Sequence, residues 1–257
     1  MDPHQIRPFP PARRIVVDAG YLSTGRHIIY GLVEADITGI KARLEQLSAQ
    51  KGIKLSFTGF LAASLARAVA DQPRGHAYQD WRGRLVIFQG VDVVTLIESD
   101  LDQVAIPHII RNAHRRDLED ISAEIRAVQG RPQSSQQAGP LVRLAPRLPR
   151  FIRLVFFRIV KLNPHWFKRL QGTVVLTSVG MFGKGGGWGI GFLPSHTLGL
   201  TVGGIARKPG VAGDQIEIRE YLDLTLAFDH DLVDGAPAAR FTSQLIEIIE
   251  TGAVLDD

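Results

Sequence analysis

The chain has 257 residues, of which 45% are hydrophobic, and it contains no cysteine. This length suits one large core or two small ones, and one catalytic-type domain is the simpler expectation. The lack of cysteine excludes a disulfide framework, a thiolate metal site and a thiol nucleophile of the protein's own. The N-terminus lacks the apolar core of a signal peptide, and no uncharged apolar run is long enough to span a bilayer, so we expect a cytoplasmic protein.

The net charge of +4 hides an uneven distribution. Residues 131–170 contain nine Lys or Arg and no Asp or Glu, so the rest of the chain carries a net charge of −5. A single basic segment therefore lies in an otherwise acidic protein. We do not expect nucleic-acid binding, because no recognised nucleic-acid module accompanies this segment.

The predicted elements mix strands and helices along the chain. Strands are predicted at residues 27–37, 85–98, 104–109, 173–178, 198–204 and 215–228, where β-branched and aliphatic residues are enriched. Helices are predicted at residues 38–50, 57–71, 115–128, 150–162 and 236–250. Strands outnumber crossover helices, which favours a mixed sheet covered by helices over a doubly wound parallel fold. A polar, mobile loop is expected at residues 130–140.

The basic segment contains a predicted amphipathic helix at residues 150–162. At about 100° per residue its cations fall within one arc, and the other faces are almost wholly apolar. These cations are Arg150, Arg153, Arg158 and Lys161. One interpretation is a helix that lies on an anionic membrane surface. We favour an inserted helix that packs against the body or a neighbouring subunit, because Leu154 and Phe157 interrupt the cationic arc.

A glycine-rich stretch, GKGGGWGIG, follows at residues 183–191. Its spacing fits neither the dinucleotide fingerprint nor the P-loop, because its Gly-Lys pair is followed by Gly and not by Ser or Thr. Two interpretations stay open. The stretch is either flexible backbone beside an active site, with Trp188 and Phe192 lining an acyl or pantetheine channel, or a surface hairpin with Trp188 packed on the body.

Residues 224–235 read LTLAFDHDLVDG. The first part alternates as a strand does and ends in His230, and Asp234 and Gly235 follow four and five positions later. A strand end holds an imidazole rigidly while the following loop admits a substrate, which suits a general base. A hydrogen-bonded strand-end histidine and a turn-forming aspartate would give the same pattern, so the surroundings must decide. The other seven histidines, at positions 4, 27, 76, 108, 114, 165 and 196, show no metal-ligand spacing, and no metal is expected.

Five collinear segments of the chain carry a resemblance to a known family. They are RHIIYGLVEADITGIKARLEQL (26–47), KLSFTGFLAASLARAVADQP (54–73), VAIPHIIRNAHRRDLEDISAEI (104–125), GTVVLTSVGMFG (172–183) and FDHDLVDGAPAARFTSQLIEIIE (228–250). Together they resemble the catalytic domain of the dihydrolipoyl acyltransferases of 2-oxo acid dehydrogenase complexes, which is related to chloramphenicol acetyltransferase. Collinear agreement of this kind is far more specific than any one motif.

The resemblance implies an α+β fold of the chloramphenicol acetyltransferase type, with a mixed sheet covered by helices. It also implies a homotrimer or a multiple of three, in which the sheet extends across subunits. Residues 1–25 would then form an N-terminal arm and residues 26–257 the catalytic domain. The basic apolar segment at 131–170 departs from the family, where a shorter and more polar link stands.

The chemistry that the resemblance implies is acyl transfer between coenzyme A, as a substrate, and a dihydrolipoyl-type thiol. His230 would be the general base, and Thr177 would donate a hydrogen bond to the oxyanion. Asp234 would hold the catalytic loop through an ion pair. Two positions depart from the family. Asp231 replaces a usual Arg and would raise the pKa of the neighbouring base, and Ser178 replaces a common Asn.

The residues before position 26 are too few for a lipoyl domain, so we expect a free-standing catalytic domain with no lipoyl group on this chain. The thiol partner would be a lipoyl domain on a separate protein, or a small molecule. An alternative hypothesis is a catalytically weakened trimeric scaffold that binds partners, attached to a membrane surface. The sequence identifies no residues that bind coenzyme A.

Overall fold

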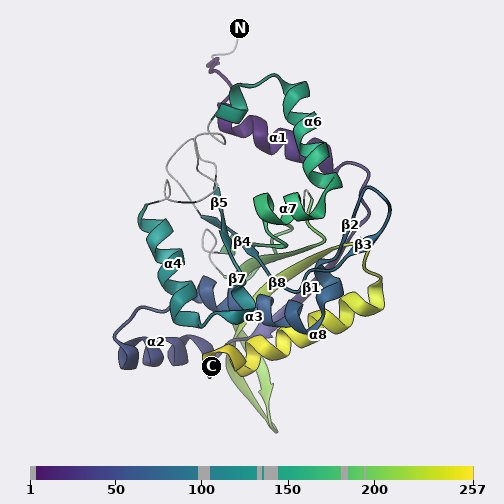
Figure 1. Ribbon diagram of the computed structural model, residues 1–257. Coiled ribbons are helices and arrows are strands. Elements are labelled where there is room, and N and C mark those ends of the chain that lie inside the picture. The colour runs from purple at the N-terminus through teal and green to yellow at the C-terminus, as the bar shows by residue number, and fades with distance from the viewer. Residues whose placement is uncertain are drawn as a thin grey trace.

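The structure is a computed structural model that describes residues 4–97, 105–131, 135, 144–180, 185–193 and 195–256 (Figure 1). Its main helices are α1 (Pro11–Ser23), α2 (Ile40–Lys51), α3 (Phe57–Asp71), α4 (Leu118–Gly130), α6 (Arg150–Leu162), α7 (Pro164–Gln171) and α8 (Gly235–Thr251). Its strands are β1 (Ile28–Asp36), β2 (Tyr78–Gln79), β3 (Leu85–Val86), β4 (Val93–Ile97), β5 (Ile106–Ile110), β6 (Val174–Ser178), β7 (Leu198–Ala212) and β8 (Gln215–Asp229).

Six strands form one mixed sheet in the order β1-β8-β7-β6-β4-β5. The β4, β6 and β7 strands are parallel, and the remaining neighbours pair antiparallel. One face of the sheet packs against helices α3, α4 and α8 in a continuous apolar core that includes Phe60, Leu65, Leu224 and Phe241. The predicted mixed sheet covered by helices is confirmed.

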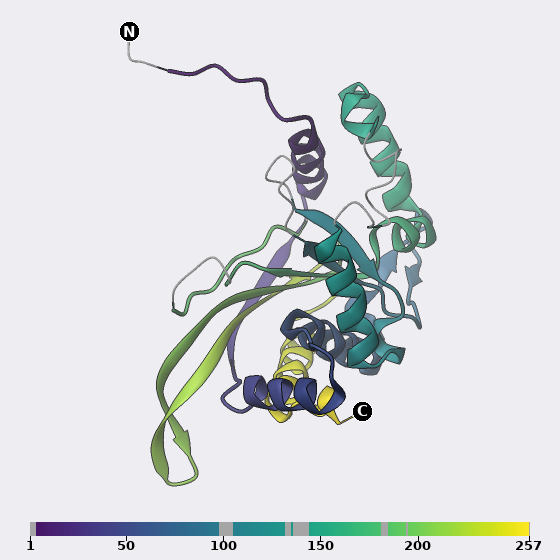
Figure 2. The same cartoon turned by 90° about the vertical axis from the view of Figure 1, so that its left-hand side faces the viewer.

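The β7 strand is longer than the sequence pattern suggests. The prediction ends it at residue 204, yet pairing with β8 continues to Ala212 through Pro209, which stands opposite Ile218. Gly213, with φ +59°, closes the turn between the two strands, a conformation that glycine adopts without strain. The outer half of this hairpin projects beyond the helices, as Figure 2 shows.

Three other expectations differ from the structure. Predicted strand 85–98 is broken into β3 and β4, and Asp92 lies in the irregular link between them. Predicted helix 115–128 begins only at Leu118, because the Asp117 side chain caps it by accepting a hydrogen bond from the Asp120 N–H. The N-terminal arm contains helix α1, and Pro164 starts the additional helix α7. Most of the predicted loop at 130–140 lies outside the described residues.

Helix α6 packs on α1 through a buried ion pair. The Arg153 Nε donates to Asp18 Oδ2 at 2.5 Å, and both side chains are at least 94% buried. Arg153, one member of the predicted cationic arc, thus faces α1 and not solvent. Val160, on the same inner side, joins Tyr78, Phe88 and Phe167 in a second small core. None of the helices within the described ranges has the length and apolar character needed to cross a bilayer.

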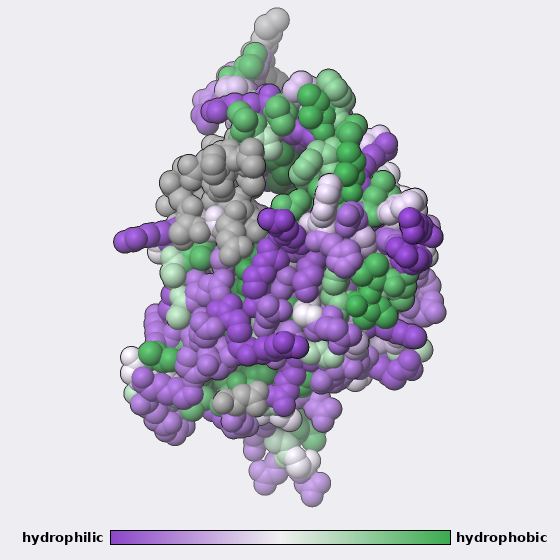
Figure 3. Space-filling model, viewed as in Figure 1, coloured by the Kyte–Doolittle hydropathy of each residue, from purple (hydrophilic) through white to green (hydrophobic). Residues whose placement is uncertain are grey.

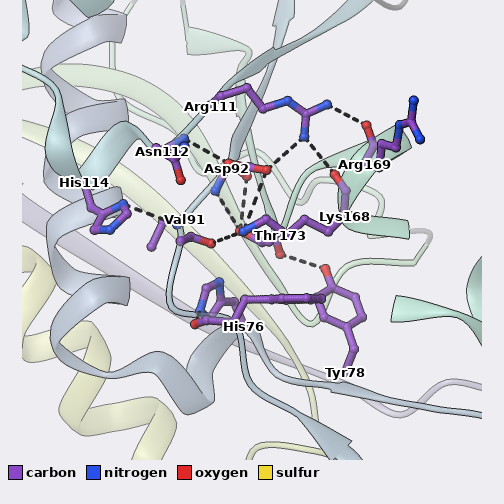
Figure 4. A network of polar contacts seen from close by, with 12 residues as sticks. His76, Tyr78, Val91, Asp92, Arg111, Asn112, His114, Lys168, Arg169 and Thr173 are labelled. Atoms are coloured by element: carbon purple, nitrogen blue, oxygen red, sulfur yellow. Dashed lines mark hydrogen bonds and ion pairs between the residues drawn. The ribbon is translucent and has the colours of Figure 1, made fainter. Parts of the chain in front are cut away.

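The buried Asp92 precedes β4 and contacts the start of β6 through its backbone, while its carboxylate binds Arg111, which reaches the end of α7 (Figure 4). It accepts hydrogen bonds from the Asn112 N–H and from Arg111 Nη1, both at 2.9 Å. Arg111 also donates to the carbonyls of Lys168 and Arg169 at the end of α7. The Asp92 N–H donates to Thr173 Oγ1 at 3.0 Å, directly before β6. The position of β6 thus depends on Asp92.

We predict that Asp92→Ala lowers the free energy of unfolding by about 3 kcal/mol, because it leaves the Arg111 guanidinium without its buried partner. Urea denaturation followed by circular dichroism would measure the loss. Glu45→Ala, on the exposed side of α2, is the matched control and should change stability by less than about 0.5 kcal/mol. Equal stabilities of the two variants would show that Asp92 does not organise this region.

Candidate functional site

His230 is the first residue after β8, and it is exposed. Its backbone is fixed on both sides. The His230 N–H donates to the His27 carbonyl at 2.8 Å, and the preceding Asp229 N–H donates to the Thr197 carbonyl at 2.9 Å. The imidazole therefore stands on rigid backbone and faces solvent, as the sequence predicted.

Directly before His230 lies a buried ion pair between Arg26 and Asp229. The Arg26 Nε donates to Asp229 Oδ2 at 3.0 Å, and the Nη2 atom makes a second, shorter contact with the same oxygen. The remaining guanidinium N–H groups donate to the carbonyls of Leu193 at 3.1 Å and His196 at 2.7 Å. Both side chains are more than nine-tenths buried. One guanidinium thus joins the start of β1, the end of β8 and the 193–196 segment.

The sequence analysis did not identify Arg26 and Asp229 as residues that support the site. The available signal was Asp229 itself, a carboxylate at the end of an apolar strand where a buried charge requires a cationic partner. Asp234 had been expected to make the ion pair that holds this loop. In the structure Asp234 is exposed and precedes α8, where its carbonyl accepts a hydrogen bond from the Ala238 N–H. Among the described residues, no ion pair reaches the Asp234 carboxylate.

Asp231 has a partner that the sequence did not indicate. Its Oδ1 lies 2.8 Å from His27 Nδ1, so its carboxylate pairs with that exposed histidine. The hydrogen bond to Asp231, together with the charge of Asp231, raises the pKa of His27. The pair places an imidazole and a carboxylate at the rim of the candidate site.

Lys161 lies at the C-terminal end of α6. Burial lowers the pKa of Lys161, and the charge of Arg26 lowers it further, whereas the charges of Asp229 and Asp231 act in the opposite direction.

Thr177 and His230 are far apart within one chain. Thr177 on β6 pairs with Thr201 on β7, which pairs with Thr225 on β8, five residues before His230. Two strand spacings across and five residues along give a separation of roughly 20 Å. A single chain therefore does not bring the predicted base and the predicted oxyanion donor together.

Thr177 and Ser178 point to opposite faces of β6 because side chains alternate along a strand. Ser178 faces the helices and lines a cavity of about 310 Å³ together with Phe57, Thr58 and Leu61 of α3. Thr177 is half-buried on the other face, beside Gly191. The two neighbouring hydroxyls thus belong to different environments.

The glycine-rich segment lies flat along β7. A Cβ atom on Gly203 would overlap the Gly187 carbonyl oxygen, and one on Gly204 would overlap the Gly185 oxygen. The Gly204 N–H donates to the Gly187 carbonyl at 2.9 Å. Close backbone approach therefore requires glycine at positions 203 and 204 of β7. Within the glycine-rich segment, Gly185 and Gly187 instead adopt positive φ values of +84° and +153°, which glycine tolerates without strain. Gly183 and Lys184 lie outside the described residues.

Trp188 and Phe192 are both half-exposed, and neither lines the 310 Å³ cavity. The Trp188 indole N–H donates to the Val33 carbonyl at 3.0 Å, which ties the segment to β1. Phe192 lies beside Gly20 of α1. Their predicted role in a channel stays a prediction.

Comparisons with known proteins agree with this geometry. Residues 158–255 match the family model described as 2-oxoacid dehydrogenases acyltransferase (catalytic domain). Over 208 residues the chain is 25% identical to the dihydrolipoyllysine-residue acetyltransferase component of the pyruvate dehydrogenase complex of Rickettsia bellii, covering 80% of this chain and 42% of that protein. The chain thus spans about two fifths of that relative's length.

Solved structures give the fold class. The dihydrolipoamide acetyltransferase of Azotobacter vinelandii superposes with a TM-score of 0.77 at 19% identity, covering 98% of this chain and 94% of that one. A chloramphenicol acetyltransferase superposes with a TM-score of 0.55 at 12% identity, covering 91% of this chain and 94% of that one. The fold is that of the chloramphenicol acetyltransferase-like proteins. The resemblance to the dihydrolipoyl acyltransferase catalytic domain is confirmed.

Two buried histidines should make stability depend on pH. Burial lowers the pKa of His196 and of His76 from 6.5 to about 4, and each Nε2 contacts a backbone carbonyl, of Gln171 and Phe88 respectively. The unfolded chain binds protons at these positions below about pH 6.5, while the folded chain does not. Their contribution is present above pH 6.5 and is lost as the pH falls toward 4, by on the order of 3 kcal/mol each.

We predict that His196→Gln flattens the decline of unfolding free energy between pH 6.5 and 4. Glutamine retains an N–H donor for the Gln171 carbonyl but does not titrate. Urea denaturation at several pH values would compare the slopes, with the exposed His165→Gln as the matched control. Parallel pH profiles for wild type and His196→Gln would contradict the prediction.

Proposed function

We propose that the protein is a CoA-dependent acyltransferase that moves an acyl group between coenzyme A and a dihydrolipoyl-type thiol. The observation that carries the proposal is the exposed His230, fixed at the end of β8 by backbone hydrogen bonds and by the buried Arg26–Asp229 pair. The fold and the family model matched by residues 158–255 support it. The site uses the protein's own side chains as base and donor.

In the proposed reaction, the neutral His230 imidazole takes the proton of the attacking thiol, whose ordinary pKa near 8.5 leaves it mostly protonated at neutral pH. The thiolate sulfur then forms a bond to the thioester carbonyl carbon, and the carbonyl electrons move to oxygen. Collapse of this tetrahedral intermediate breaks the bond to the leaving sulfur. The imidazolium returns its proton to that sulfur, so the base is regenerated.

The negative oxygen of the intermediate needs a fixed hydrogen-bond donor, and we assign this role to the Thr177 hydroxyl. Because Thr177 lies roughly 20 Å from His230 in the same chain, the donor must come from a neighbouring subunit. We therefore propose a homotrimer, or a multiple of three, with each site shared between two chains. The sheet geometry supports this arrangement because it separates the two groups within one chain.

The spacing of His230 and Asp234 provides further support. In the Azotobacter vinelandii dihydrolipoamide acetyltransferase, a serine, a histidine and an asparagine four positions after that histidine were investigated for their role in the catalytic mechanism. Asp234 stands four positions after His230, and it is exposed at the start of α8. We assign Asp234 a positioning role in the assembled site, and we assign the intrachain support of the loop to Asp229.

The acyl acceptor is proposed by analogy with the relatives. One is named as the acetyltransferase component of a pyruvate dehydrogenase complex, which suggests a lipoyl domain as the partner thiol. We propose that this domain lies on a separate protein. An assay with acetyl-CoA and free dihydrolipoamide tests the transfer itself, and chloramphenicol as acceptor tests the small-molecule alternative. No turnover of a folded trimer with any of these would favour the partner-binding scaffold.

We predict that His230→Ala lowers kcat by at least about a hundredfold, because the thiol loses its base. Thr177→Val should lower kcat by about a hundredfold and leave coenzyme A affinity nearly unchanged, because the donor acts on the oxyanion. Ser178→Ala is the matched control, since it removes the adjacent hydroxyl on the opposite face. Steady-state kinetics of folded variants would measure all three.

Two outcomes would contradict parts of this assignment. Unchanged turnover in both His230→Ala and Thr177→Val would remove the proposed active site. A loss in Ser178→Ala without a loss in Thr177→Val would move the oxyanion donor to the cavity face of β6.

We predict that His230→Ala and Thr177→Val chains, each inactive alone, regain activity when mixed under conditions of subunit exchange. Some interfaces then combine an intact His230 with an intact Thr177. Sedimentation equilibrium would establish the oligomeric state, and labelled subunits would establish exchange. A monomer, or free exchange without recovered activity, would contradict shared sites.

A further inference from the structure

The outer face of α6 is an exposed apolar stripe on a basic helix. Its members point away from the body and are between 41% and 69% exposed. They are Phe151, Ile152, Val155, Phe156, Ile159 and Leu162. At about 100° per residue they span an arc of roughly 140°. Figure 3 shows this apolar surface where α6 lies in the view of Figure 1.

The body of the chain already packs on the inner face of α6. The outer stripe is therefore not the face through which α6 packs on its own chain. Arg153 is buried against Asp18 of α1, and Val160 is buried against Phe167 of α7 and its neighbours. Helix α6 thus packs against the body of the chain, as the sequence analysis favoured, through the narrow face that carries Arg153 and Val160. The wider apolar side remains outside.

The charges around the stripe indicate what covers it. The sequence from 131 to 170 contains no carboxylate, and exposed Arg147 and Arg158 lie before and within the helix. The nearest acid on α1, Asp18, is buried and paired. A second copy docked face to face would bring these arginines against their own equivalents. An anionic surface, in contrast, would attract them.

The position of the helix suits a flat partner. Figures 1 and 2 show α1 and α6 at the end of the molecule opposite the β7–β8 hairpin. A helix of 13 residues is about 20 Å long. Its whole length can lie along a flat surface, and the sheet would not touch that surface. An apolar stripe flanked by arginine is what an interfacial helix uses to enter the boundary between lipid headgroups and acyl chains.

We propose that the outer face of α6 binds an anionic lipid bilayer and attaches the protein to a membrane surface without crossing it. The apolar stripe inserts, and Arg147 and Arg158 contact acidic headgroups. The attachment does not depend on the proposed acyl transfer, because neither the stripe nor these arginines include His230 or Thr177.

Vesicle co-sedimentation of the full chain tests the proposal. Vesicles of about one part phosphatidylglycerol to three parts phosphatidylcholine should bind the protein at low salt, and pure phosphatidylcholine vesicles should bind it at least about tenfold more weakly. Raising the salt from about 0.05 M to about 0.5 M should weaken binding to the anionic vesicles. Absence of binding to anionic vesicles at low salt would overturn the proposal.

Two pairs of variants separate the contributions of the stripe and the charges. Phe151→Ser with Phe156→Ser should weaken binding at least about tenfold, because both side chains leave water on insertion. The matched control is Ile216→Ser with Ile218→Ser on the exposed hairpin. Arg147→Glu with Arg158→Glu should weaken binding at least about tenfold and reduce its salt dependence. Its control is Lys54→Glu with Arg207→Glu, the same charge change on exposed residues elsewhere.

Retained lipid binding in both stripe and charge variants, or equal losses in the controls, would overturn the proposal. Sedimentation velocity without lipid tests separately whether the stripe is a contact between subunits. If Phe151→Ser with Phe156→Ser reduces the oligomer, the stripe is a subunit contact and the lipid assignment is wrong. If acyl transfer is absent but lipid binding follows the expected pattern, the proposed function fails and this inference stands.

Discussion

The buried pair of Arg26 and Asp229 is the constraint on which the candidate site depends. It connects residues 203 positions apart and fixes the strand end from which His230 projects. Two desolvated charges are stable only while both are present, and removal of one leaves the other uncompensated at a cost of about 3 to 5 kcal/mol. The position of the exposed imidazole therefore depends on an ion pair that is itself almost completely buried.

The β6 strand is likewise held in place by residues outside the candidate site. Thr177 lies on a short strand whose start is held by Thr173 and Asp92, not by the candidate site itself. Both proposed functional groups thus stand on strands held next to a buried aspartate, Asp229 for His230 and Asp92 for Thr177. Arg26 serves one carboxylate and Arg111 serves the other. The side chains of His230 and Thr177 therefore do not hold the strands in place. They are free to act as the proposed base and hydrogen-bond donor.

Much of the fold could be predicted because it follows local periodicity. Alternation identified β8 to within one residue of its end at Asp229, and helical spacing identified α8 within one residue at each end. Features that depend on distant partners could not be predicted. The sequence grouped Arg153 with the other cations of the helix, because nothing near it in sequence shows that it pairs with Asp18, 135 positions earlier.

The same limit applies to the candidate site. The motif contains His230 and Asp234, whereas the ion pair within the chain is formed by Asp229, which the motif does not single out. The extension of β7 past Pro209 was missed because Lys-Pro-Gly is typical of a turn, and only the partner strand shows that pairing continues. Residue types alone do not reveal which of two carboxylates is desolvated.

The Asp18–Arg153 pair also has a consequence for how this protein could have diverged. The contact between α1 and α6 buries both charges, so a change at one residue alone would leave the other in the contact without a counterion. Although the two residues lie 135 positions apart in the sequence, we expect homologues to keep both or to replace both.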